Sequence, residues 1–201
     1  TNIRGIKIAY PSTGADLKGL IKAAYYDPNP VVLLEHKGLY WSKIPGTEGA
    51  MSIEPDEDYV VPFGKARVVQ EADVDAISKG ESCVIITYGM GVYWSIEAAK
   101  EFDGRVEIID LRTLNPLDIN IIKISIEKTG KALIVYEDNL TNGPGAEISA
   151  IIGEKCFEYL DGPIKRIASK DSPVPFNWFL ENKVLPQTED IAFGIKELLE
   201  Y

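Results

Sequence analysis

Two segments carry side chains that could take part in chemistry, and both follow apolar runs typical of buried strands. Gly89-Met90-Gly91 could present a helix N-terminus to a phosphate group. It lacks the third glycine of a dinucleotide-binding motif and has no Lys-Ser/Thr pair, so a tight strand-to-helix turn is favoured. Glu137-Asp138 could transfer protons or hold a cation. Adjacent residues of a strand point in opposite directions, which favours a solvated or interface-forming loop over two carboxylates sharing a proton.

The other reactive side chains are few and isolated. His36 is the only histidine, and beside Glu35 it is interpreted as a structural hydrogen-bonding group rather than a base. Cys83 and Cys156 have no metal-type spacing and lie among apolar residues, which predicts reduced core thiols in a cytoplasmic protein. No serine or cysteine is accompanied by a base. The sequence therefore predicts no catalytic and no cofactor-binding residue in this chain.

The composition is that of a globular protein with one or two domains. The 201 residues are 45% hydrophobic and 26% charged, and no apolar run approaches a membrane-spanning length. A net charge of −10 argues against nucleic acid as a partner and suits either a basic protein partner or plain solubility. The N-terminus has no initiator Met and no signal-peptide core, and it reaches a strand-like run within a few residues. We therefore expect a piece of a longer protein.

The order of predicted elements indicates three regions. Residues 1–41 predict a strand, a helix that ends before Pro28, and a buried strand over 31–34, the last unit of an α/β domain that begins upstream. Residues 42–64 are rich in proline, glycine and acids without periodicity, which indicates a linker. Residues 65–201 alternate strands and helices.

The alternation in the third region defines the expected fold class. Strands are predicted over 83–88, 106–110, 132–136 and 163–167, and helices over 92–102 and from Asp118, Pro144 and Thr188 onward. Such alternation predicts a three-layer α/β domain whose mainly parallel sheet is covered by helices on both faces.

Several segments, taken in order, go beyond this general pattern. They are Tyr10-Pro11-Ser12-Thr13, the segments 27–35 and 110–118, the segment 141–148, and the segments 171–175 and 185–191. The segment 110–118 is similar to a signature of transketolase C-terminal domains. The whole set resembles the β subunit of the thiamine-diphosphate-dependent decarboxylating component of 2-oxo acid dehydrogenase complexes, across essentially the entire chain.

This resemblance implies an oxidoreductase that decarboxylates a 2-oxo acid and transfers the acyl group to a lipoyl group. It implies that residues 1–41 end the pyrimidine-binding domain and that 65–201 form the transketolase-type C-terminal domain. Thiamine diphosphate and Mg²⁺ would belong to the full enzyme, because the family's cofactor-activating glutamate and active-site histidine lie upstream. Glu35 and His36 do not match those two positions, so the chain alone is expected to be inactive.

The resemblance also implies one metal site and three protein partners. A loop of the family binds a monovalent cation such as K⁺ largely through backbone oxygens, and it matches Ala24, Tyr25, Asp27 and Asn29. Implied partners are the α subunit, a second β subunit and the dihydrolipoyl acyltransferase, with no nucleic acid and no membrane.

The acyltransferase's small basic peripheral-subunit-binding domain would dock on the C-terminal domain. Candidate contacts are Glu197, Glu200 and Tyr201 at the end of the chain, where acidic side chains suit a basic partner.

Departures from the family pattern bear on the substrate. Tyr136 stands where the family commonly has histidine, Asn142-Gly143-Pro144 replaces a more glycine-rich stretch, and the linker is richer in proline and acids. A branched-chain 2-oxo acid is slightly favoured over pyruvate.

Two other interpretations stay open. The chain could be the C-terminal domain of a transketolase or deoxyxylulose-phosphate synthase, although the segments 171–175 and 185–191 favour the dehydrogenase. It could also be a non-catalytic binding module, against which the first strand–helix–strand unit argues, because its sheet neighbours are missing.

Overall fold

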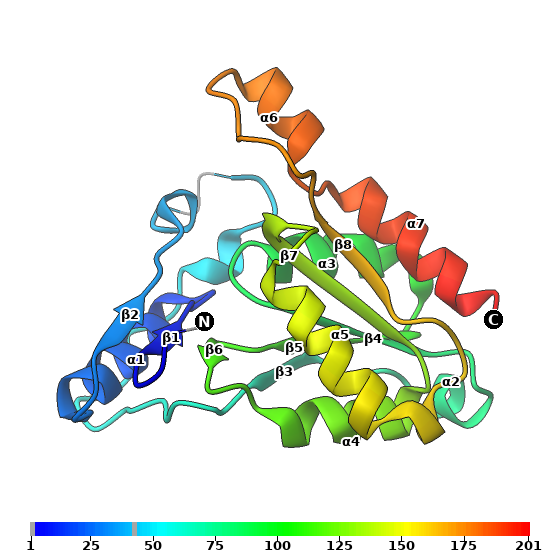
Figure 1. The fold of residues 1–201 in the computed structure, drawn as a ribbon, viewed down its shortest axis with the longest axis horizontal. Helices are drawn as coiled ribbons and strands as arrows, with labels where there is room; N and C mark the ends of the chain where they lie inside the picture. Colours follow the sequence, from blue (N-terminus) through cyan, green and yellow to red (C-terminus); the bar gives the residue numbers. More distant parts are fainter. Residues whose placement is uncertain (1–2, 42–43) are drawn as a thin grey trace.

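The computed structural model describes residues 3–41 and 44–201, which form two sheets and their covering helices (Figure 1). The strands are β1 (Lys7–Ala9), β2 (Val31–Leu33), β3 (Arg67–Gln70), β4 (Cys83–Thr87), β5 (Val106–Asp110), β6 (Thr113–Asn115), β7 (Ala132–Asn139) and β8 (Lys165–Ser169). The helices are α1 (Gly14–Tyr26), α2 (Val74–Ser78), α3 (Gly91–Ala99), α4 (Ile119–Thr129), α5 (Pro144–Lys155), α6 (Trp178–Val184) and α7 (Thr188–Leu199).

The larger sheet has the strand order β3-β5-β4-β7-β8. β4 lies at its centre and pairs in parallel with β5 and β7, and β7 pairs in parallel with β8. Within this larger sheet, only β3, at one edge, runs antiparallel to its neighbour among the described residues. The predicted mainly parallel sheet is confirmed.

Helices cover both faces of this sheet because successive strand residues point to opposite sides. Val84 and Ile86 of β4 pack in one cluster with Ile122 and Ile126 of α4 and with residues of α5. Cys83 and Ile85 of the same strand pack on the other face, with residues of α3 and α7. The domain therefore has three layers, as predicted, and both cysteines are free and buried.

The N-terminal region forms the predicted strand, helix and strand. Thr13 caps α1 by accepting a hydrogen bond from the backbone N–H of Asp16 at 3.2 Å, and the helix ends at Tyr26, ahead of Pro28. The expectation that residues 31–34 form a buried strand is wrong. Val32 and Leu34 remain 42% and 41% exposed, because they share the face of β2 opposite to that of Leu33, which packs with Ala9 and Leu20.

A strand from the C-terminal region completes the smaller sheet, whose order is β2-β1-β6. β1 pairs in parallel with β2 and antiparallel with β6, which directly follows β5 of the larger sheet. The first strand–helix–strand unit is therefore not an orphan within this chain, and the expectation that all its sheet neighbours are missing is corrected. The two sheets are joined by a turn of only two residues between Asp110 and Thr113.

The predicted linker packs along the surface of α1. Apart from a 3₁₀ turn over Glu48–Ala50, its described residues, 44–64, form no helix or strand. The backbone N–H of Val61 donates to the carbonyl of Gly19 at 3.2 Å, and a Cβ on Gly19 would lie 2.6 Å from the Val61 side chain. Residues 42 and 43 of the predicted linker lie outside the described residues, and the domain boundaries stay a prediction.

The start of the last helix agrees with the sequence analysis. α7 begins at Thr188, the residue from which the sequence predicts it, and its N-cap is Gln187, whose backbone N–H donates to Asp190 Oδ2 at 3.0 Å. None of the helices in the described ranges, 3–41 and 44–201, is long and apolar enough to cross a membrane.

Candidate functional site

A buried polar cluster joins the N-terminal unit to the larger sheet. We call Ser12, Asp16, Arg67, Asp110 and Arg112 the joint cluster. Arg112 Nη2 lies 2.8 Å from Asp16 Oδ1, and Arg67 Nη2 lies 3.3 Å from Asp110 Oδ2 and 3.7 Å from Asp16 Oδ2. The Ser12 hydroxyl donates to Asp110. The side chains of both aspartates are almost fully buried, at 2% and 0% exposed.

Local backbone geometry brings the joint cluster together. The Thr13 cap fixes the first turn of α1 and so places Asp16 against the end of β5. Arg112 adopts a left-handed conformation at φ 57°, and its backbone N–H donates to Asp110 Oδ1 at 3.1 Å. Burial raises the pKa of Asp110, while the Ser12 hydrogen bond and the Arg67 guanidinium oppose that rise. The cluster acts as a structural clamp between α1, β3 and β5.

A second contact between the two regions centres on Glu137. The Tyr10 hydroxyl donates to Glu137 Oε2 at 3.1 Å, and His36 Nε2 lies 3.3 Å from Glu137 Oε1. Glu137 lies inside β7 with its side chain only 19% exposed, so the expectation of a solvated or interface-forming loop is wrong for this residue, which contacts Tyr10 and His36 within the chain. Asp138 is exposed, as opposite-facing side chains require.

The carboxylate of Glu137 shifts the pKa of both its partners, His36 and Tyr10. Its hydrogen bond raises the pKa of His36 above the ordinary value, against the lowering effect of burial. Burial and the same carboxylate raise the pKa of the Tyr10 hydroxyl. His36 thus contacts Glu137 between the loop after β2 and the end of β7, which agrees with its interpretation as a structural hydrogen-bonding group.

Replacing Glu137 with glutamine is expected to cost about 1–2 kcal/mol at pH 6 and less at pH 8. His36 has a raised pKa in the folded state, so its stabilisation is fully present below the unfolded pKa and is lost as pH rises through the folded one. Glutamine can still accept from Tyr10 but cannot pair with imidazolium. Urea unfolding of both proteins at the two pH values measures the difference, and an equal cost at both would contradict this assignment.

Gly89 and Gly91 form the tight turn that the sequence favoured. Gly89 has φ 57°, and a Cβ there would lie 2.9 Å from the Tyr10 ring. A Cβ on Gly91 would lie 2.2 Å from Thr87 Oγ1. Both glycines are thus explained by close approach of backbone to neighbouring side chains.

The candidate cation loop lies at the end of α1, as the sequence placed it. The Ala24 carbonyl accepts from the backbone N–H of Asp27 at 3.3 Å, and Tyr25 is largely exposed. The Asp27 carboxylate pairs with Lys7 and accepts from the backbone and side-chain nitrogens of Asn29 at 2.9 and 3.0 Å. These bonds lower the pKa of Asp27, the Lys7 contact most. The Lys7 ammonium and the Asn29 nitrogens therefore engage the two carboxylate oxygens of Asp27 separately, Oδ2 and Oδ1.

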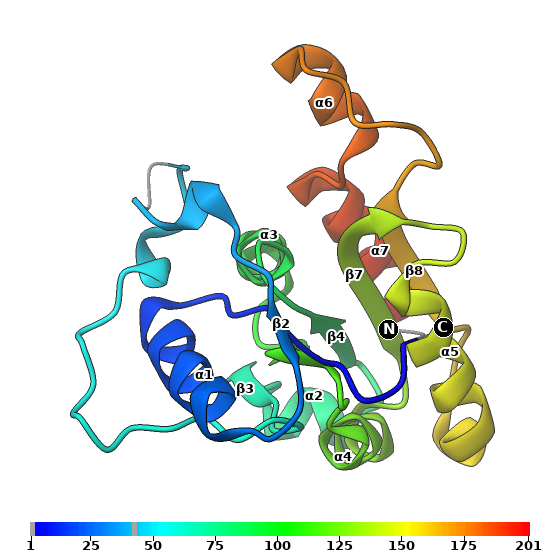
Figure 2. The same ribbon diagram turned by 60° about the vertical axis from the view of Figure 1, so that its left-hand side comes forward.

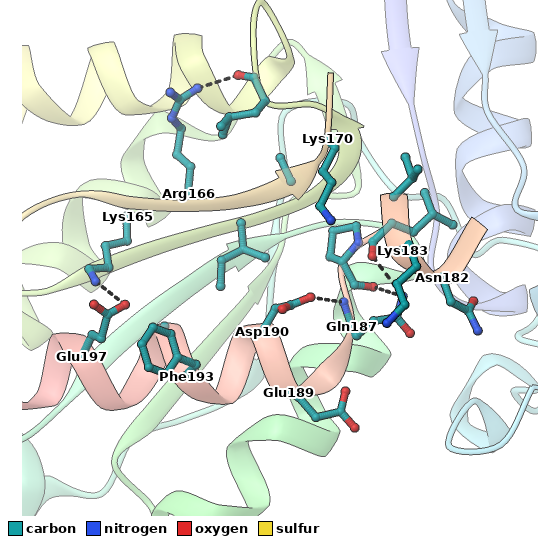
Figure 3. A pocket seen from close by; sticks show the side chains of 17 residues that line it. Lys165, Arg166, Lys170, Asn182, Lys183, Gln187, Glu189, Asp190, Phe193 and Glu197 are labelled. Atoms are coloured by element: carbon teal, nitrogen blue, oxygen red, sulfur yellow. Dashed lines mark hydrogen bonds and ion pairs between the residues drawn. The ribbon is translucent and has the colours of Figure 1, made fainter. Parts of the chain in front are cut away.

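The C-terminal region holds a groove of about 790 Å³ between β8, α7 and the end of α6 (Figure 3). Phe193 and Glu197 of α7 line it from one side, and Lys165 and Lys170 from the other. Lys165 Nζ lies 2.5 Å from Glu197 Oε2, so one of the candidate docking residues is engaged within the chain. Glu200 and Tyr201 are exposed at the end of α7, close to this groove in the sequence but not among its lining residues.

Sequence reasoning missed the joint cluster, Glu137 as a shared acceptor and the basic side of the groove. The segment 110–118 was singled out for its similarity to a family signature, and two of its residues, Asp110 and Arg112, proved to be members of the cluster. In the described ranges, no group of three or more His, Cys, Asp or Glu side chains could hold a metal ion.

Comparison with known proteins agrees with this architecture. Residues 72–191 match the model of the transketolase C-terminal domain. Over 99% of the chain the fold is similar to a solved structure described as a split-gene transketolase, an inactive beta4 tetramer, with TM-score 0.74, 17% sequence identity and 59% of that chain covered.

Named relatives with higher identity align over nearly the whole chain. The chain is 36% identical to the pyruvate dehydrogenase E1 component subunit beta of Rhizobium meliloti, covering 98% of this chain and 40% of the relative. It is 39% identical to the 2-oxoisovalerate dehydrogenase subunit beta of Bacillus subtilis, covering 100% and 58%. A Staphylococcus aureus pyruvate dehydrogenase E1 subunit beta is 40% identical, with 98% and 57% covered. The chain thus spans about half the length of these relatives. Because the family model matches more than half of its residues, the chain belongs to the transketolase C-terminal domain family.

Proposed function

We propose that this chain is the C-terminal part of the β subunit of a thiamine-diphosphate-dependent 2-oxo acid dehydrogenase, serving subunit assembly and acyltransferase docking. The observation that carries the proposal is the alignment with dehydrogenase β subunits along 98% to 100% of the chain, at 36% to 40% identity. The assembled enzyme would oxidatively decarboxylate a 2-oxo acid and pass the acyl group to a lipoyl acyltransferase.

The residues of this chain fit a supporting part in that reaction. Thiamine diphosphate and Mg²⁺ would belong to the assembled enzyme, where the resemblance assigns the cofactor-activating glutamate to a part upstream of this chain. Among the candidate residues, Glu137 is held by Tyr10 and His36 in a contact between strands. The proposal assigns cofactor binding to the portion of the relatives that this chain does not match.

Docking is proposed at the exposed end of α7. Glu200 and Tyr201 are open to solvent there, whereas Glu197 pairs with Lys165 and contributes less free charge. A chain of net charge −10 favours a basic partner. The α subunit, a second β subunit and the acyltransferase are the proposed partners. A K⁺ ion at the backbone oxygens near Ala24 and Asp27 belongs to the proposal, and a higher melting temperature in KCl than in choline chloride would support it.

The substrate is proposed to be a branched-chain 2-oxo acid ahead of pyruvate. Relatives named for either substrate have nearly equal identity, so their names do not separate the two. A transketolase remains the second candidate, favoured by the shared C-terminal domain.

The chain supplied with thiamine diphosphate, Mg²⁺ and either 2-oxo acid is expected to release no carbon dioxide by itself. Adding the α subunit and the upstream part of the β subunit should restore release and acylation of a lipoyl domain. Turnover by the isolated chain would overturn the assignment of catalysis to the missing portion. A reconstituted enzyme that transfers ketol groups without a lipoyl domain would favour the transketolase.

A further inference from the structure

The carboxyl ends of β4 and β7 lie side by side at a point where the chain diverges. β4 leads through α3 to β5 on one side, whereas β7 leads through α5 to β8 on the other. α3 and α5 therefore cover opposite faces of the larger sheet (Figures 1 and 2). Such a switch point in an open α/β sheet leaves a crevice at the strand ends, where ligands bind. The fold thus places a candidate ligand site beside the residues that follow β4 and end β7.

A cavity of about 370 Å³ lies at this crevice, within the range of ~300–1,000 Å³ that small-molecule sites occupy. It is separate from the groove beside α7, with which it shares no lining residue. Residues of the smaller sheet form part of its wall, so the cavity also lies where the two sheets meet. Its apolar lining residues are Ile8, Leu34, Leu114 and Pro144, and its polar ones are Tyr10, Tyr88, Glu137 and Asp138.

Tyr88, which directly follows β4, has a hydroxyl without a protein partner. The residue is only 4% exposed, yet none of the described residues forms a hydrogen bond with its hydroxyl. Burial raises the pKa of Tyr88, and the charges of Asp138 and Glu137 raise it further, so both carboxylates lie near the hydroxyl. Almost all buried polar groups form a hydrogen bond. A ligand in the cavity would supply the missing partner.

The two carboxylates of the cavity keep the capacity to accept further hydrogen bonds. Glu137 Oε2 accepts from Tyr10 and Oε1 lies 3.3 Å from His36 Nε2, which leaves a free lone pair on each oxygen. Asp138, on the exposed rim, uses Oδ1 for the backbone N–H of Asn139 at 2.7 Å, and its Oδ2 has no hydrogen bond with the described residues. Two carboxylates against one imidazole leave the cavity negative, so it favours a cation and repels an anion.

We propose that this cavity binds a small primary alkylamine in its protonated form. An alkylammonium group has three N–H donors, and the Tyr88 hydroxyl, Glu137 and Asp138 offer three acceptors for them. The rings of Tyr10 and Tyr88, with centroids 5.4 Å apart, add attraction between the cation and aromatic electrons. The apolar lining residues contact the alkyl chain. This site goes beyond the proposed function, because none of its residues was assigned there to docking or to a metal ion.

NMR titration of the complete chain with n-butylammonium chloride at about pH 7, where the amine is protonated, tests the proposal. Saturable shifts are expected at the backbone amides of residues 88–91 and 137–139, with a dissociation constant of about 1–10 mM. Sodium butanoate, of similar size but negative, should cause none there. Tetramethylammonium has the charge without N–H donors and should bind at least about fivefold more weakly. No saturable shift with butylammonium, or equal binding of either comparison ion, would overturn the proposal.

Two variants separate a ligand site from a structural one. Asp138→Asn should weaken butylammonium binding about tenfold, and Tyr88→Phe about fivefold, because each removes one acceptor. Without ligand, Tyr88→Phe should unfold in urea at the same midpoint as wild type or a higher one, since its hydroxyl has no partner to lose. Glu154→Gln, on the exposed face of α5, is the matched charge control and should bind within about twofold of wild type. Wild-type binding by either site variant, or a clear loss of stability in Tyr88→Phe, would contradict the inference.

Discussion

Asp16→Ala is expected to lower the free energy of unfolding by about 3–5 kcal/mol. The Asp16 carboxylate is 2% exposed and lies 2.8 Å from Arg112 and 3.7 Å from Arg67. Removing it leaves the Arg112 guanidinium, itself only 14% exposed, without its carboxylate partner. A buried charge without a partner costs far more free energy than the intact ion pair contributes. The loss of stability in Asp16→Ala is therefore expected to exceed the contribution of one hydrogen bond.

Urea unfolding followed by circular dichroism measures this cost. Glu154→Ala on the exposed face of α5 is the control, and it should change stability by less than about 0.5 kcal/mol. A cost below about 1 kcal/mol for Asp16→Ala would mean that the cluster is not the clamp between α1 and the larger sheet.

Tyr136→Ala is expected to cost a similar amount, about 3–5 kcal/mol, for a different reason. Tyr136 is among the largest fully buried side chains and lies within β7, with its ring against the start of α5. Its ring is so close to that turn that a Cβ on Gly143 or Gly145 would lie 2.7 or 2.0 Å from ring atoms. Truncation would leave a cavity where strand, turn and helix meet.

Tyr136→Phe separates the ring from the hydroxyl. The hydroxyl donates to the Leu140 carbonyl at 3.4 Å, a long bond, so its loss should cost less than about 1 kcal/mol. Thermal unfolding of the two variants should rank alanine well below phenylalanine. Equal losses would assign the stability to the hydroxyl and would contradict the packing argument.

The same turn illustrates what the sequence could predict. Apolar runs such as 83–88 and 132–136 predicted buried strands because every side chain of a doubly covered parallel strand must be apolar. Pro144 predicted the start of α5 and Asp118 the cap of α4, and both are confirmed. These signals lie within a few residues of the element they specify.

Elements whose signals are weak or whose partners are distant escaped prediction. β3 is half-buried at an edge, β6 has three residues, and α6 has no buried face to impose a period. β2 resembled a buried strand by composition, yet Leu33 packs on the core while Val32 and Leu34, on its other face, stay exposed.

The candidate site was hardest to foresee because its members are far apart in sequence. Ser12 and Asp110 are 98 positions apart, and Tyr10 and Glu137 are 127 apart. Charge and hydrogen-bonding partners at such separations follow from the fold alone. The motif segments containing Tyr10 and Asp110 were recognised, but the contacts that make them structural were not predictable from spacing.

Calorimetric titration with a basic peripheral-subunit-binding domain, at low and at moderate salt, tests most directly whether this chain is a supporting part that carries a docking site. Binding is expected to weaken as salt rises, with a several-fold further loss in Glu200→Lys but not in Glu154→Lys. Failure of the folded, wild-type chain to bind at low salt would contradict the docking role and favour the transketolase interpretation.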